Sequence, residues 1–218
     1  PREDYSVARY VEEASACVDD ILRRGRLPIV AGGTGLYIDA LLAGLSFAPF
    51  TGGHRERLQA RVRAEGIVPL YAELEKLDPR RWAKLHLNDE KRILRALEVY
   101  YETGETITAH DARTKDQPPR YSALTLALNY ADRAQLWQRI DARVDEMMAA
   151  GLEDEVRALL REGIPRRATA MQAIGYKELA AALDEGRSVQ EGAEEIKLRS
   201  RQYAKRQLSW FRRNEAAK

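Results

Sequence analysis

The residues best suited to chemistry lie in a glycine-rich turn after a short apolar run. The run covers residues 27–31, and the turn consists of Gly32, Gly33, Thr34 and Gly35, ahead of a helical pattern. Glycines permit a sharp turn and a close backbone approach to a ligand, and the free N–H groups at the start of the helix suit phosphate. The turn is therefore a candidate floor of an active site, although a purely structural turn fits the same residues.

Two pairs of arginines share single faces of predicted helices. Arg92 and Arg95 lie three residues apart at the start of a helix, where positive charge opposes the helix macrodipole. Arg139 and Arg143 lie four residues apart in a later helix. Guanidinium groups bind phosphate oxygens through paired hydrogen bonds, so both pairs are candidates for phosphate contacts. A solvated charged face is the alternative for the first pair, and surface pairing with nearby aspartates is the alternative for the second.

The last predicted helix is strongly basic. Between residues 197 and 213 it carries seven Lys or Arg residues and no acidic residue, with Tyr203, Trp210 and Phe211 interleaved. Basic side chains contact phosphates and aromatic rings stack on bases, so this helix is a candidate for binding nucleic acid or another polyanion. Because Tyr203, Gln207 and Trp210 also recur at the spacing of a packed helix face, packing is the alternative for the aromatic rings.

Composition excludes several classes of protein. The 218 residues are 44% hydrophobic and 32% charged, which is typical of a soluble globular chain, and no apolar run approaches the roughly 20 residues of a membrane span. The N-terminus lacks the apolar centre of a secretory signal, and the single cysteine excludes an internal disulfide, so we expect a cytoplasmic location. The three histidines are far apart in sequence, so we assign no metal ligands.

The elements around these residues predict an α/β core with a helical insertion. The apolar runs 27–31 and 122–129 have the length of buried strands in a parallel sheet. Between them we find a Pro- and Gly-rich linker at 46–53 and then charged helices, without a strand signal. We predict the first part of the core in residues 1–46, the helical insertion in 47–121 and the second part of the core in 122–218.

Capping residues predict several helix ends. Ser188 and Glu191 have the spacing of a capping box ahead of the last helix, and Thr169 and Gln172 have the same spacing ahead of the preceding helix. Gly104 is placed to end the helix that carries Arg92 and Arg95, because glycine readily adopts the left-handed conformation found after helices.

Four stretches together resemble the tRNA dimethylallyltransferases, also called tRNA isopentenyltransferases. They follow that family's order, and the resemblance covers nearly the whole chain. The stretches are PIVAGGTGLYIDALLAGLS (28–46), LHLNDEKRILRALEVYYETG (85–104), ATAMQAIGYKEL (168–179) and RSRQYAKRQLSWFR (199–212). The resemblance implies transfer of a dimethylallyl group from dimethylallyl diphosphate to N6 of adenosine 37 in tRNA. It also implies a P-loop-kinase-like parallel sheet core that carries an all-helical, tRNA-binding insertion.

The resemblance also implies roles for individual residues. Thr34 matches a threonine near the substrate adenosine and Arg143 matches the arginine that holds the diphosphate, so these two are the catalytic candidates. Gly32 and Gly33 are assigned to diphosphate binding together with Arg143. The residues that match tRNA-contacting positions are Thr34, Arg55, Lys91, Arg92, Ile93, Leu94, Arg95, Gln172, Ala173, Ile174, Gly175, Tyr176 and Lys177. A Gln172 side chain committed to a capping box cannot also read a base, and we prefer the family role.

Two motifs of the family do not occur in this sequence. Family members begin with a P-loop of the kind GPTASGKT and a DSxQ-like motif whose aspartate is the proposed general base. We therefore expect the core to be incomplete, the ligands of the expected Mg²⁺ cofactor to lie in the missing segment, and this polypeptide to have little or no activity alone. The expected partners are a tRNA anticodon stem-loop and dimethylallyl diphosphate, with no membrane and no reason to expect an obligate oligomer.

Two other functions stay open on the sequence. A tRNA-binding module without chemistry would show the same basic residues. A small-molecule kinase of the P-loop class is a weaker hypothesis, since the helical insertion and the basic last helix argue against it.

Overall fold

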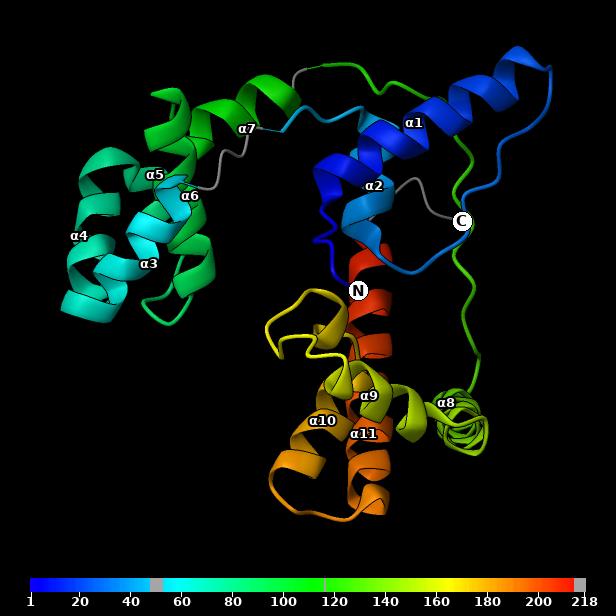
Figure 1. The fold of residues 1–218 in the computed structure, drawn as a ribbon. Coiled ribbons are helices and arrows are strands. Elements are labelled where there is room, and N and C mark those ends of the chain that lie inside the picture. The colour runs from blue at the N-terminus through cyan, green and yellow to red at the C-terminus, as the bar shows by residue number, and fades with distance from the viewer. Residues whose placement is uncertain (48–52, 116, 214–218) are drawn as a thin grey trace. The chain divides into compact units, whose positions relative to one another are not determined.

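The computed structural model describes residues 1–47, 53–115 and 117–213, which form helices joined by extended segments (Figure 1). The chain divides into two compact units. The first unit combines Pro1–Ala40 with Ser122–Lys218, and the second is Leu41–Tyr121. Most of the linker predicted at 46–53 lies outside the described residues.

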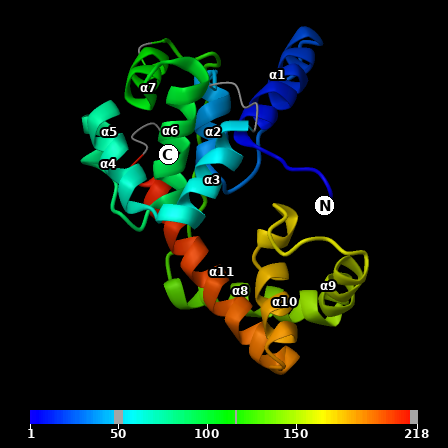
Figure 2. The same cartoon turned by 60° about the vertical axis from the view of Figure 1, so that its left-hand side comes forward.

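The first unit is built around its last helix. Its helices are α1 (Val7–Arg23), the start of α2 (Gly35–Ala43), α8 (Arg133–Ala149), α9 (Leu152–Arg161), the short 3-10 helix η1 (Ala170–Gln172), α10 (Tyr176–Asp184) and α11 (Val189–Phe211). Helix α10 lies beside α11 in both views (Figure 2), and α8 also packs on α11. The core between them contains the buried side chains Val144, Val156, Met171, Leu179 and Ile196. These apolar positions recur at helical spacing, so burial of one face per helix holds the unit together.

The second unit consists, in its described part, of helices alone. They are α3 (Gly53–Glu65), α4 (Val68–Leu77), α5 (Pro79–Trp82), α6 (Glu90–Thr103) and α7 (Ile107–Lys115). Their core includes Leu58, Leu70, Leu74, Ile93 and Leu97. Gly104 follows α6 with a φ of 71°, the left-handed conformation that ends a helix, so the predicted end of this helix is confirmed.

The sheet predicted for the core is not formed by the described residues. Residues 27–31 and 122–129 are extended, but they make no strand beyond an isolated bridge at Thr125. Their apolar side chains face solvent, with Ile29 83% exposed and Leu128 95% exposed. A buried parallel strand needs hydrogen-bonded neighbours and helices over both faces, and the described chain supplies neither to these segments. The strand predictions were therefore wrong for this structure, although the segments are extended.

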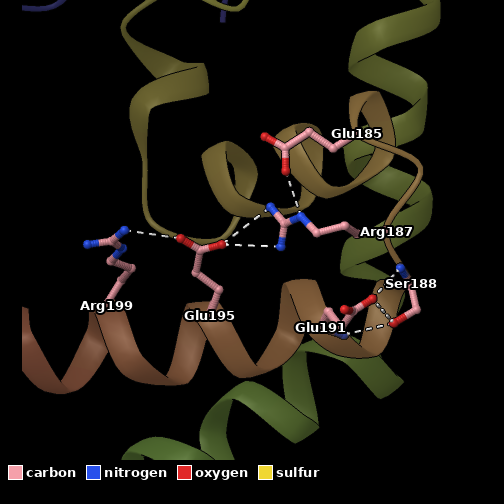
Figure 3. A network of polar contacts seen from close by, with 6 residues as sticks. All are labelled: Glu185, Arg187, Ser188, Glu191, Glu195 and Arg199. Carbon is pink, nitrogen blue, oxygen red and sulfur yellow. Dashed lines mark hydrogen bonds and ion pairs between the residues drawn. The ribbon is translucent and has the colours of Figure 1, made fainter.

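The capping box predicted for α11 is confirmed. Ser188 accepts a hydrogen bond from the N–H of Glu191 at 3.2 Å, and its own N–H donates to the Glu191 carboxylate at 2.8 Å (Figure 3). The Ser188 hydroxyl and N–H hold the pKa of Glu191 below its usual value. Next to this box, Arg187 donates to both Glu185 and Glu195, which fixes the turn between α10 and α11.

The second predicted capping box is wrong. Helix α10 begins at Tyr176, and the N–H of Gly175 donates to the carboxylate of Glu178 at 2.8 Å. Thr169 instead donates to Asp4 from its hydroxyl, and Gln172 ends the 3-10 helix η1. The spacing of Thr169 and Gln172 fitted a helix start, but the chain makes a further turn before α10 begins.

Removing the confirmed cap tests how much it stabilises α11. Ser188→Ala is expected to lower the free energy of unfolding by about 1 kcal/mol, because the N–H of Glu191 loses its acceptor. Chemical denaturation monitored by circular dichroism measures the change. Ser209→Ala is the matched control, since this exposed hydroxyl bonds the carbonyl of Lys205 within its own helix and should leave stability within about 0.5 kcal/mol. An equal decrease in the free energy of unfolding in the two variants would show that the capping hydrogen bond does not stabilise the helix.

Candidate functional site

Helix α11 fixes the glycine turn through polar side chains. The amide of Gln207 donates to the carbonyl of Gly33 at 2.9 Å, and the indole N–H of Trp210 donates to the carboxylate of Asp39 at 2.9 Å. Gln207 and Trp210 lie three residues apart and therefore share one face of the helix. The turn and the first turns of α2 are thereby held against the C-terminal half of α11.

Thr34 begins helix α2 within this contact. Its carbonyl accepts hydrogen bonds from the N–H groups of Tyr37 and Ile38, so the residue sits at the helix N-cap. Its hydroxyl lies 3.3 Å from the phenol oxygen of Tyr203, and its side chain is exposed. Arg206 stacks over the ring of Tyr203, with its guanidinium carbon 5.6 Å from the ring centre. The Thr34 hydroxyl is therefore accessible to a ligand, and a guanidinium group lies over the ring of the tyrosine beside it.

Close packing explains two of the three glycines around Thr34. A Cβ atom on Gly33 would lie 2.0 Å from the Gln207 amide, and one on Gly35 would lie 2.2 Å from the Trp210 ring. A Cβ atom on Gly32 would meet nothing within 4 Å. Gly33 and Gly35 are therefore needed for contact with α11, whereas the structure gives no steric reason for Gly32. The assignment of Gly32 and Gly33 to diphosphate binding stays a prediction.

Arg143 projects from α8 into solvent. Its side chain is 70% exposed, and its ion pair with Glu146 is long, at 3.4 Å. The aspartates expected to neutralise it pair elsewhere, since Asp141 accepts from Arg201 and Asp145 accepts from Lys197, both on α11. Arg143 is therefore available to an anionic ligand. Among the described residues, no hydrogen bond or ion pair joins it to the glycine turn.

The basic run of α11 divides into two halves. Lys197, Arg199 and Arg201 are all paired with carboxylates, and the carboxylates of Asp145 and Glu194 raise the pKa of Lys197. In the part of the chain that the structure describes, no carboxylate pairs with the later cations. These are Lys205, Arg206, Arg212 and Arg213. The uncompensated charge thus lies in the half of α11 that also holds the glycine turn.

The predicted tRNA-contacting run 172–177 forms the approach to α10. The amide of Gln172 donates to the carbonyl of Arg166 at 2.7 Å, and the phenol of Tyr176 donates to Glu155. The bond to Glu155 and partial burial raise the pKa of Tyr176 to about 12. Ala173 and Lys177 are exposed, whereas Gly175 is buried with a φ of 109°. The run therefore offers few side chains to a partner, chiefly Gln172 and Lys177.

The remaining candidates lie in the second unit, mostly on α6. Lys91 and Arg92 are exposed, and the ion pair of Arg92 with Asp89 is long, at 3.8 Å. Ile93 and Leu94 are buried in the core of this unit, so their side chains do not reach a surface ligand. Of the predicted run 91–95, the side chains that can still reach a ligand are therefore the three cationic ones.

Arg55 and Arg95 meet at a residue that the sequence did not single out. Both donate to the carboxylate of Glu98, Arg55 at 2.9 Å and Arg95 at 2.8 Å. Glu98 is almost fully buried, at 1% exposure. An acidic residue on the apolar face of α6 was the available signal, and it indicates a buried ion pair.

The described residues do not offer a metal site. No group of three or more His, Cys, Asp and Glu side chains among them is arranged to hold an ion. The residues present therefore do not fit the Mg²⁺ expected from the resemblance, and we assign no step to it. None of the described helices combines the length and apolar character of a transmembrane span.

Comparisons with known proteins agree on one family. The family model described as IPP transferase matches residues 1–214. The tRNA dimethylallyltransferase of Caldanaerobacter subterraneus subsp. tengcongensis is 41% identical over 215 residues, covering 97% of this chain and 68% of the relative. That of Symbiobacterium thermophilum is 44% identical over 215 residues, covering 98% of this chain and 66% of the relative.

Solved structures give the same result. The tRNA isopentenylpyrophosphate transferase of Bacillus halodurans has a TM-score of 0.65 at 36% identity, over 100% of this chain and 67% of that chain. A eukaryotic dimethylallyltransferase acting on tRNA has a TM-score of 0.76 at 31% identity, over 95% of this chain and 53% of that chain. The chain belongs to the IPP transferase family, whose curated relatives are tRNA prenyltransferases. It spans about two thirds of the length of the bacterial relatives.

The packing of the glycine turn on α11 can be tested with two substitutions in that turn. Gly35→Ala is expected to lower the free energy of unfolding by about 1–3 kcal/mol, because the new methyl group displaces Trp210. Gly32→Ala is the matched control and should be close to neutral in stability, since its methyl group meets nothing. Denaturant unfolding of both variants gives the comparison. A Gly35→Ala variant that is more stable than the unmodified chain would contradict the close packing, because alanine is favoured over glycine in a helix where space allows.

Proposed function

We propose that this chain supplies the tRNA-facing part, and part of the diphosphate-binding part, of a tRNA dimethylallyltransferase. In this reaction the N6 amine of adenosine 37 forms a bond to the reactive carbon of dimethylallyl diphosphate. The carbon–oxygen bond to the diphosphate breaks, and the nitrogen loses a proton to a general base. The chain shares its family with enzymes named for this activity, and its candidate residues fit parts of the reaction.

The observation that carries the proposal is the dual role of α11. The same half of the helix holds the turn with Thr34 and presents cations that no described carboxylate neutralises. Cationic side chains bind RNA phosphates, and a base that acts as substrate must leave its stack to reach the enzyme. We infer that Lys205, Arg206, Arg212 and Arg213 hold the backbone of the anticodon loop while Thr34 contacts the extruded adenosine.

Arg143 has the complementary role in this proposal. The diphosphate gains negative charge as the carbon–oxygen bond breaks, and a guanidinium group stabilises that charge through paired hydrogen bonds. The exposed Arg143 side chain, whose contact with Glu146 is long, is suited to this task. Cations of α6 in the second unit, Lys91 and Arg92, are proposed to bind phosphates of the anticodon stem.

The activity of this polypeptide is the first test. Because the sequence has neither a P-loop nor a DSxQ-like motif, we expect little or no prenylation of tRNA in an assay with dimethylallyl diphosphate and Mg²⁺. When a P-loop segment is supplied in the same polypeptide, turnover should appear, and Arg143→Ala should then lower it by about 100-fold with little change in tRNA affinity. Turnover by the 218 residues near that of an intact relative would contradict the first expectation. Unchanged turnover in the Arg143→Ala variant would contradict the role of Arg143.

Binding of RNA tests the second part of the proposal. A labelled anticodon stem-loop should bind with an affinity that falls steeply as salt rises, and Arg92→Ala should weaken binding and reduce the salt slope by about one. Arg23→Ala is the control, since this exposed arginine of α1 lies outside every candidate set. Binding without turnover in the completed polypeptide would favour a tRNA-binding module without chemistry. Salt-independent binding, or equal effects of the two substitutions, would contradict the proposed phosphate contact.

A further inference from the structure

A buried carboxylate organises two of the basic residues in the second unit. Glu98 lies on α6 beside Leu94 and Leu97 and is 1% exposed. A carboxylate removed from water is strongly unfavourable unless cations and hydrogen-bond donors compensate it. Among the described residues, its Oε2 atom accepts hydrogen bonds while its Oε1 atom has no partner. The compensation is therefore concentrated on one oxygen.

The two donors come from different helices. The Arg55 guanidinium reaches Oε2 from α3 at 2.9 Å, and the Arg95 guanidinium reaches the same atom from one turn earlier in α6 at 2.8 Å. Because both bonds end on one oxygen, the two guanidinium groups must be neighbours. Their side chains remain 43% and 30% exposed. The carboxylate thus lies inside the unit while both cations extend from it to the surface.

We propose that Glu98 is a positioning residue that holds Arg55 and Arg95 together as a joint binding site for one backbone phosphate of the tRNA. The inference rests on the proposed function, because the ligand is the RNA that the second unit would bind. A guanidinium group presents its N–H donors in a planar fork, a geometry that suits phosphate oxygens. Two arginines already fixed in place lose less conformational freedom on binding than two mobile ones.

Net charge alone and a positioning role predict opposite changes in RNA affinity when the Glu98 carboxylate is removed. If Glu98 only added negative charge near the RNA, its removal would tighten binding. If it positions the arginines, its removal weakens binding even though the protein becomes more positive. The sign of the change in affinity therefore separates the two roles.

The experiment measures binding of an anticodon stem-loop RNA to the 218-residue chain over a range of salt. Glu98→Gln is expected to weaken binding by about fivefold, an effect of the size of one lost phosphate contact. Glu90→Gln removes an exposed acid from the start of the same helix and should leave binding unchanged or slightly tighter. Tighter or unchanged binding by Glu98→Gln would overturn the proposal.

A variant cycle separates positioning from a general structural role. In the Arg55→Ala, Arg95→Ala background, Glu98→Gln should have no further effect on affinity, because there is nothing left to position. An undiminished loss in that background would show that Glu98 acts only through the stability of the unit. Arg55→Lys, which keeps the charge at a half-exposed site, should also weaken binding several-fold, since lysine lacks the planar fork. Binding of Arg55→Lys equal to that of the unmodified chain would overturn the joint site even if Glu98→Gln fails to fold.

Failure of the proposed function gives a different result. If the unmodified chain does not bind the stem-loop, the proposed function fails and this inference fails with it. If the unmodified chain binds and the Glu98→Gln and Arg55→Lys variants bind equally well, only the inference fails.

Discussion

Helix α11 carries a dense run of positive charge and also packs against its neighbours, so some of its cations are removed from water. The cations that lie where α11 packs on α8 and α10 form ion pairs with carboxylates. Arg201 is bound to Asp141, and Lys197, only 11% exposed, is bound to Asp145. A cation that far from water requires a carboxylate close by, so these pairs are a condition of packing. The cations that could serve a polyanionic ligand are confined to the other half of the helix.

The same division explains how the glycine turn becomes part of the site. In the C-terminal half of α11, one face holds Gln207 and Trp210, which bond the turn and α2. The adjacent outward positions hold Lys205, Arg206 and Arg212. Because of the helical period, the side chains that bond the turn and the cations that face solvent lie on neighbouring faces of the same helix. The accessible Thr34 hydroxyl and the uncompensated charge are placed by a single element.

Features that depend on local sequence could be predicted well. The start of α11 at Ser188 and the end of α6 at Gly104 follow from side-chain and backbone preferences within a few residues. The Thr169 prediction failed because the same spacing also occurs in a chain that makes a 3-10 turn, and only distant contacts such as that with Asp4 decide between them. Local signals were sufficient only where no distant partner competed.

The site was harder to predict because its partners are far apart in sequence. The spacing of Tyr203, Gln207 and Trp210 indicated a packed face but could not reveal that it packs on the glycine turn. Glu98 was missed for a related reason, since a glutamate in a helix is usually solvent-exposed, and the partners that compensate its burial include Arg55 of α3. The resemblance to a family located the candidate residues, whereas the contact between the glycine turn and α11 came from the structure.

The extended segments show what the position of Thr34 depends on. In a complete parallel sheet, the strand before a glycine turn is held by ladders of backbone hydrogen bonds on both sides. Here residues 27–31 have no such ladder within the described chain, and the exposed Ile29 shows that no layer covers them. The polar contacts that fix the turn therefore come from α2 behind it and α11 beside it. Because Gln207 bonds the carbonyl of Gly33, directly before Thr34, the orientation of the Thr34 hydroxyl depends on a helix that is 174 residues away in sequence.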